Sequence, residues 1–122
     1  RPENIYYSEN EYLDVEFGLT GWGDRPTPQQ YLLDAYTSTT QYNESRFSTT
    51  ELDALITQAG QTADVEARAE LYAQIARVFA DNDQVIVPYF APVIGAVTNN
   101  VEGLELAPFP GLTDLRVVML VE

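Results

Sequence analysis

Around Trp22 the sequence reads Gly18-Leu19-Thr20-Gly21-Trp22-Gly23-Asp24-Arg25-Pro26-Thr27-Pro28-Gln29-Gln30-Tyr31-Leu32, and its pattern changes twice within this stretch. Upstream of the tryptophan, apolar and polar residues alternate, which is the period of a strand with one buried face. Downstream, Gly23 and Pro26 interrupt the extended pattern, and Thr27 followed by Pro28 marks the beginning of a helix. The stretch therefore predicts a strand over 13–22, a short loop and a helix.

The loop between this strand and helix is a candidate binding site. In α/β folds, ligands bind at the carboxyl ends of strands, where a helix N-terminus directs its unpaired N–H groups. Asp24 and Arg25 would lie at the mouth of such a crevice, with Trp22 as an aromatic wall. The alternative is a buried Trp22 beside a solvated Asp24–Arg25 pair, and periodicity alone favours that alternative.

Three helices are expected. The first runs from Pro28 to the polar cluster 37–40. The second begins at the capping box 48–51 and ends at Gly60 as its C′ residue. The third begins after Asp64 as N-cap and ends at Asp81-Asn82-Asp83. Its core-facing stripe consists of Val65, Ala69, Tyr72, Ile75, Ala76 and Phe79.

Two later apolar runs predict further strands. Residues 85–90 are rich in β-branched side chains, and Pro88 places the second half of this run at an edge or bend. Residues 115–121 are apolar on both faces, as central strands are. The fold class is therefore α/β with few strands and three helices, and its sheet edges lack partners. We expect those partners in a larger protein or in a second copy of the chain.

The chain is strongly acidic. Its 122 residues include nineteen Asp or Glu against six Lys or Arg, all of them arginine, for a formal net charge of −13. This charge argues against nucleic acid and anionic membranes as partners. The acids are spread along the chain, as in the proteins of salt-loving microbes. We therefore expect salt to stabilise the fold by screening the repulsion between them.

The chain lacks cysteine, histidine and lysine, so the usual bases near neutral pH and the soft metal ligands are missing. The triplet 81–83 has calcium-type ligands without the glycine and distal glutamate of an EF-hand. We expect no metal, no cofactor and no enzymatic activity. Two alternatives stay open, a structural or dimerisation module and a hydrolase based on two carboxylates.

Several short segments also follow one another in an informative order. They are Trp22-Gly23-Asp24-Arg25-Pro26-Thr27-Pro28, Tyr42-Asn43-Glu44-Ser45-Arg46-Phe47, Leu52-Asp53-Ala54-Leu55, Asp64-Val65-Glu66-Ala67-Arg68, Leu71-Tyr72 and Val85-Ile86-Val87-Pro88. Together they resemble the C-terminal part of extracellular solute-binding proteins of the dipeptide/oligopeptide ABC-transporter class (family 5). The resemblance extends from Leu13 to Val121 and rests on the series, because no single segment is specific.

This resemblance implies a fragment of a two-lobed, periplasmic-binding-protein-like fold of type II. Residues 1–92 would belong to the second ligand-closing lobe, 93–98 would form the hinge crossover, and 99–122 would return to the first lobe. The implied function is that of the substrate-binding component of an ABC importer. Such a component captures a peptide or another small solute for transport across the membrane.

The resemblance also implies a ligand site at Trp22, Gly23, Asp24, Arg25 and Asn43. Asp24 matches the family's acid that pairs with the α-amino group of a peptide, although the loop is shorter than Trp-x-x-Asp and places Arg25 beside the acid. The implied partners are the ligand, the permease subunits and the remainder of the binding protein. The implied location is extracytoplasmic, with a lipid anchor on the full-length protein, and the fragment is expected to self-associate.

Overall fold

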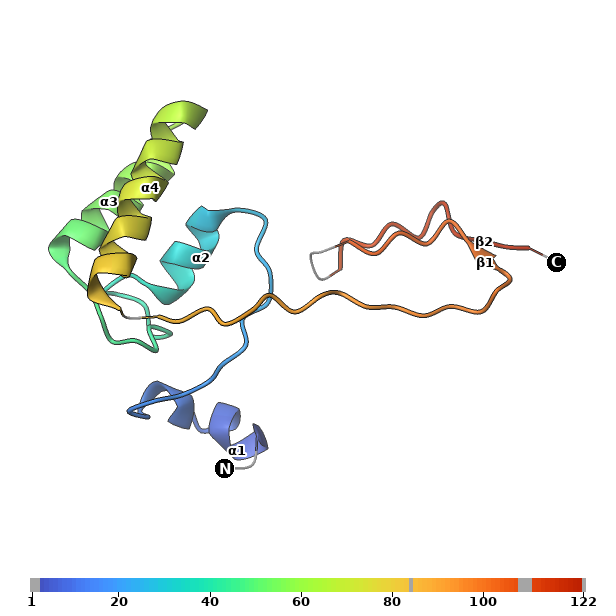
Figure 1. Ribbon diagram of the computed structural model, residues 1–122, viewed down its shortest axis with the longest axis horizontal. Coiled ribbons are helices and arrows are strands. Elements are labelled where there is room, and N and C mark those ends of the chain that lie inside the picture. The colour runs from blue at the N-terminus through green and yellow to red at the C-terminus, as the bar shows by residue number, and fades with distance from the viewer. Residues whose placement is uncertain (1–2, 84, 108–110, 122) are drawn as a thin grey trace. The chain divides into compact units, whose positions relative to one another are not determined.

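The computed structural model describes residues 3–83, 85–107 and 111–121, which form a mixed structure of helices and one small sheet (Figure 1). In chain order its elements are α1 (Glu3–Ser8), the 3₁₀ helix η1 (Glu11–Leu13), α2 (Pro28–Ala35), α3 (Thr50–Gln61), α4 (Val65–Asn82), β1 (Val101–Glu102) and β2 (Met119–Leu120). The chain divides into two compact units. The helical unit comprises Arg1–Gly21 and Thr27–Ile86, and the extended unit comprises Trp22–Pro26 and Val87–Glu122.

The core of the helical unit lies where α2, α3 and α4 pack together (Figure 1). Its buried side chains are Leu32, Leu52, Ile56, Ala59, Leu71 and Ile75. Leu52 and Ile56 of α3 are completely buried, so α3 is the central helix. At the edge of this core, Phe79 of α4 packs edge-on against Tyr36, with ring centroids 4.7 Å apart.

The beginnings of α2, α3 and α4 were predicted to within one residue. Asp64 is the N-cap of α4, and its carboxylate accepts a hydrogen bond from Ala67 N at 2.8 Å. Thr49 is the N-cap of α3, and its side chain accepts a hydrogen bond from Leu52 N at 3.0 Å. The predicted capping box began one residue earlier, at position 48. Thr27 occupies the N-cap position of α2, but its side chain makes no cap hydrogen bond.

The predicted end of α3 at Gly60 was wrong, because Gly60 lies within the helix, which continues to Gln61. The glycine has a packing role instead. A Cβ at position 60 would stand only 2.8 Å from Nε2 of Gln29, whose amide donates to the carbonyl oxygen of Ile56 at 2.9 Å. The missing side chain of Gly60 therefore makes room for a hydrogen bond between α2 and α3.

The predicted stripe of α4 was only partly right. Ile75 is buried, and Tyr72 and Phe79 pack against the core, but Val65, Ala69 and Ala76 are exposed. The stripe omitted Leu71, which is buried. The face toward α3 is centred on Leu71 and Ile75, four residues apart, and Val65 lies a turn before that face begins.

The predicted strand over 13–22 did not form. Leu13 ends η1, and the following residues are irregular, with 90% of Phe17 and 73% of Leu19 exposed. Residues 85–90 likewise lack strand structure where they are described. Alternation predicts which face a strand would bury, but a strand also needs a hydrogen-bonded neighbour. The described residues supply no neighbour to either segment.

The C-terminal strand predicted over 115–121 is reduced to β2. β2 pairs antiparallel with β1, with Val101 opposite Leu120 and Glu102 opposite Met119. A backbone hydrogen bond from Val121 N to Asn100 O at 2.8 Å extends the ladder. The strand thus finds a partner within its own chain, whereas the sequence suggested one outside an autonomous fold.

Gly103 follows β1 with φ of +79°, and a Cβ there would lie 2.2 Å from the carbonyl oxygen of Val117. This position requires glycine for both its conformation and its close approach.

The segment 87–97 of the extended unit forms no hydrogen bond within the described part of the chain. Most of its large apolar side chains face solvent, led by Phe90 at 87% and Ile94 at 84% exposed. No charged residue occurs between Asp83 and Glu102. No helix among the described residues combines the length and apolar character required to cross a lipid bilayer.

Candidate functional site

Four of the five predicted site residues lie consecutively at the start of the extended unit, as Trp22, Gly23, Asp24 and Arg25. The Arg25 side chain folds back over this segment. Its Nη1 donates to the carbonyl oxygen of Gly23 at 2.9 Å and to that of Asp24 at 3.3 Å. Its Cζ lies 5.8 Å from the centre of the Trp22 ring, within range of a cation–π contact. Arg25 therefore holds the tryptophan ring and the loop together.

Asp24 is exposed, and Arg25 contacts its backbone carbonyl oxygen instead of its carboxylate. Within the described ranges the carboxylate of Asp24 has no hydrogen-bond or ion-pair partner. Trp22 is half-buried. The segment thus presents an aromatic ring, a guanidinium and an unpaired carboxylate within four residues.

Asn43, the fifth predicted residue, belongs to the helical unit and is engaged within its own loop. Its Nδ2 donates to Phe47 O at 2.7 Å, and its Oδ1 accepts from Ser45 Oγ at 2.8 Å. The next residues of this loop connect to the N-terminal part of the chain. Glu44 accepts a hydrogen bond from Thr20, and Arg46 forms an ion pair with Asp14. Asn43 therefore acts in the described structure as a loop-ordering residue.

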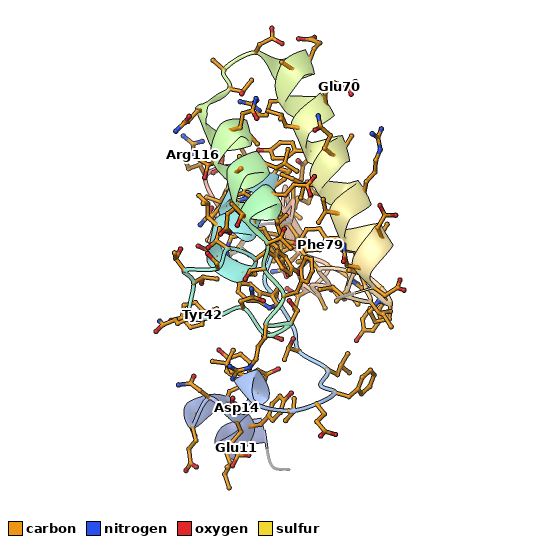
Figure 2. The ribbon with its side chains drawn as sticks, turned by 90° about the vertical axis from the view of Figure 1, so that its left-hand side faces the viewer. Glu11, Asp14, Tyr42, Glu70, Phe79 and Arg116 are labelled. Carbon is orange, nitrogen blue, oxygen red and sulfur yellow. The ribbon has the colours of Figure 1, made fainter. Side chains whose placement is uncertain are left out.

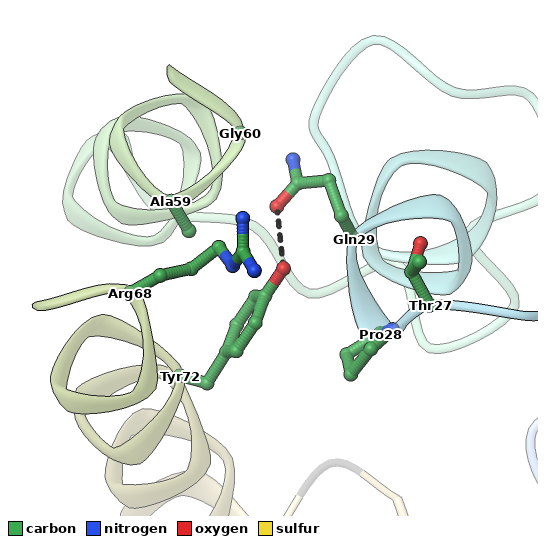
Figure 3. A pocket seen from close by; sticks show the side chains of 7 residues that line it. All are labelled: Thr27, Pro28, Gln29, Ala59, Gly60, Arg68 and Tyr72. Atoms are coloured by element: carbon green, nitrogen blue, oxygen red, sulfur yellow. Dashed lines mark hydrogen bonds between the residues drawn. The ribbon is translucent and has the colours of Figure 1, made fainter. Parts of the chain in front are cut away.

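A hollow of about 210 Å³ lies between α2, α3 and α4 (Figure 3). It is lined by Thr27, Pro28, Gln29, Ala59, Gly60, Arg68 and Tyr72. The side chains of Gln29, Arg68 and Tyr72 point toward one another across it (Figure 3). The Tyr72 hydroxyl donates to Gln29 Oε1 at 3.4 Å. Sequence reasoning missed this site, although Arg68 and Tyr72 are four residues apart and so share a helix face.

A second hollow of about 450 Å³ lies near the end of α2 and is rich in hydroxyl groups. Its lining residues are Leu33, Thr37, Thr39, Thr40, Asp53 and Thr57. The carboxylate of Asp53 already accepts from the backbone N and the hydroxyl of Ser38, at 3.0 and 2.5 Å. Thr40 and Thr57 donate to backbone carbonyl oxygens. The polar groups of this hollow therefore serve mainly to close the turn after α2.

Five described groups have displaced pKa values, namely Tyr6, Tyr12, Tyr36, Asp114 and Arg116, and two of them illustrate the causes. Burial, with smaller contributions from Tyr31 and Glu44, raises the pKa of Tyr36 to about 12. In the extended unit, hydrogen bonds from the Arg116 side chain and backbone lower the pKa of Asp114. Among the described residues no cluster of three acidic side chains could hold a metal ion.

No family model, curated protein or solved structure matches this chain.

Proposed function

We propose that the chain is the C-terminal section of a substrate-binding component of an ABC importer that captures a peptide or another small solute. The proposal starts from the ordered series of segments between Leu13 and Val121 that resembles this class of protein. It includes the two-lobed fold and the hinge at 93–98, both of which remain predictions. The observation that carries the proposal is the arrangement of Trp22, Asp24 and Arg25.

These three side chains offer the groups needed to bind both ends of a short peptide. The unpaired carboxylate of Asp24 suits an α-amino group, and the guanidinium of Arg25 suits a carboxylate. The ring of Trp22 supplies the apolar wall typical of small-molecule sites. Arg25 uses Nη1 for the two backbone carbonyl oxygens and so is held close to the ring.

The exposed apolar segment 87–97 supports the view that further structure covers this chain. Side chains such as Phe90 and Ile94 are the kind that folded proteins bury, and they stand here on an extended backbone without hydrogen bonds. A larger binding protein would provide the missing strands and apolar cover. A second copy of the chain would do so as well.

The test is calorimetric titration of the complete protein with tri-alanine, N-acetyl-tri-alanine and tri-alanine amide. We expect Asp24→Asn to weaken binding of tri-alanine more than tenfold and to remove the preference for a free amino end. Arg25→Gln should remove the preference for a free carboxylate in the same way. Losing one partner of a desolvated charge contact costs about 2–5 kcal/mol.

Asp81→Asn is the matched control, because Asp81 is an exposed aspartate of α4 and loses the same charge. Its affinity for tri-alanine should equal that of the unmodified protein. Equal affinities in Asp24→Asn, Arg25→Gln and the control would remove the proposed site. Failure of all three peptides to bind would remove peptides as the ligand class.

A dimerisation module is the second candidate, and the exposed segment 87–97 favours it. Sedimentation velocity over a range of protein concentrations separates the two functions. Self-association that disappears in Phe90→Ser, with no peptide binding, would select the dimerisation module. A monomer that binds tri-alanine would select the solute-binding function.

A further inference from the structure

Arg68 is an unusual arginine in this chain. It belongs to the first turns of α4 and is half-buried at the hollow between α2, α3 and α4. Acidic residues outnumber basic ones by nineteen to six, yet Arg68 has no carboxylate partner within the described residues. The other described arginines of the helical unit differ, because Arg46 is paired with Asp14 and Arg77 is exposed.

The guanidinium of Arg68 is only partly used. Its Nη1 donates to the carbonyl oxygen of Thr62, the C-cap residue of α3, at 3.3 Å. That single contact is the ordinary interpretation, in which Arg68 caps a helix end. A guanidinium has five N–H donors, so most of its capacity remains available to the hollow.

Further polar side chains and two apolar ones line the hollow beside Arg68. The Tyr72 hydroxyl and the Gln29 amide converge on the same space as Arg68 (Figure 3). The Gln29 amide is held there by its hydrogen bond to Ile56 O, for which Gly60 leaves room. Pro28 and Ala59 give the hollow an apolar side.

We propose that this hollow binds a small organic carboxylate, with Arg68 as its charged anchor. A planar carboxylate accepts two parallel N–H bonds from a guanidinium, which is the geometry arginine favours. The hydroxyl of Tyr72 donates to Gln29 over a long 3.4 Å contact and can turn to donate to the ligand instead. The apolar side of the hollow accommodates a short aliphatic tail, which inorganic phosphate and sulfate lack.

This proposal is independent of the peptide site, because it uses none of Trp22, Asp24 or Arg25. The test is nuclear magnetic resonance titration of the complete protein with sodium propionate at constant ionic strength. Binding should shift the backbone amides of Ala59 and Gly60 with a Kd in the millimolar range, as expected for a ligand of few atoms. Phosphate and sulfate should shift the same amides at least several-fold more weakly.

Arg68→Gln should weaken propionate binding about tenfold or more, because a hydrogen-bonded charge contact is lost. Tyr72→Phe, which keeps the ring in the core, should weaken it several-fold. Arg77→Gln is the matched control on the same helix and should leave the Kd unchanged. Should Arg68→Gln fail to fold, Tyr72→Phe and Arg68→Lys still test the site, and the latter should bind more weakly because the planar fork is missing.

Three results would overturn the proposal. The first is the absence of any shift at Ala59 and Gly60 with propionate. The second is an unchanged Kd in folded Arg68→Gln and Tyr72→Phe. The third is tighter binding of phosphate than of propionate, which would reject the carboxylate as the ligand class.

Discussion

Tyr36 connects α2 to the rest of the helical unit. Its ring packs edge-on against Phe79, lies 6.0 Å from Tyr31, and is partly buried. Because burial disfavours the phenolate, the folded protein holds the pKa of Tyr36 near 12, above the usual 10.0. A raised pKa in the folded state means that high pH favours unfolding.

We predict that the free energy of unfolding falls between pH 10 and pH 12 in part through Tyr36. The contribution is fully present below the unfolded pKa of 10.0 and is lost as the pH rises toward the folded value. Because Tyr36 is partly exposed, we expect its contribution to the free energy of unfolding to be only about 1–2 kcal/mol. Denaturant unfolding at several pH values should show a smaller decrease in Tyr36→Phe. An identical decrease in both proteins would show that Tyr36 does not titrate in this way.

Truncation of Leu52 tests whether α3 is the central helix of the core. Leu52 is completely buried, whereas Leu33 on α2 is 48% exposed, so the same truncation has different consequences at the two positions. We predict that Leu52→Ala lowers the free energy of unfolding by about 2–5 kcal/mol, and Leu33→Ala by about 1 kcal/mol or less. Urea denaturation followed by circular dichroism measures both. Similar losses would mean that α3 is not the central helix.

Among the elements, α2 and α3 begin with the same residue type at the N-cap. Thr49 accepts a hydrogen bond from Leu52 N, while the side chain of Thr27 makes no cap bond. We therefore predict that Thr49→Ala costs about 1 kcal/mol and Thr27→Ala only a few tenths. The comparison uses the unfolding free energy of each variant. A larger loss for Thr27→Ala would show that it caps α2 in solution.

The helices α2, α3 and α4 were predictable because their signals are local. Pro28 and Asp64 mark the first turns of α2 and α4. The hydrogen bonds of these turns join residues that are only a few positions apart in the sequence. The segments 13–22 and 85–90 were misjudged because a strand depends on a neighbour, which neither the alternation of 13–22 nor the β-branched residues of 85–90 identify. The hollow at Arg68 was missed for a similar reason, since Gln29 and Tyr72 meet only after α2 and α4 have both packed against α3.

For the whole molecule, charge is the dominant property. Acidic side chains occur along most of the chain outside the uncharged segment between Asp83 and Glu102. Three of them, Glu70 on α4, Glu11 in η1 and Asp14 after it, are labelled in Figure 2. With a net charge of −13, their mutual repulsion opposes compact folding, and dissolved ions screen it.

We predict that raising NaCl at neutral pH increases the Tm by several degrees, or about 1 kcal/mol. Differential scanning fluorimetry over a range of NaCl concentrations measures this change. The same titration near the isoelectric point of about 4.1 is the control, because little net charge remains there to screen. A Tm that stays flat or falls at neutral pH would contradict the prediction.

The uncharged segment between Asp83 and Glu102 lacks the charged side chains that disfavour amyloid-like assembly. Elsewhere the acids act as gatekeepers, since charge disfavours the stacking of strands from separate chains. Here that protection falls to Pro88 and Pro92, which flank Tyr89, Phe90 and Ala91. Because proline lacks an N–H donor, each interrupts the ladder that a cross-β stack would require. Pro88 and Pro92 therefore disfavour strand stacking in this hydrophobic stretch, as the nineteen carboxylates do in the rest of the chain.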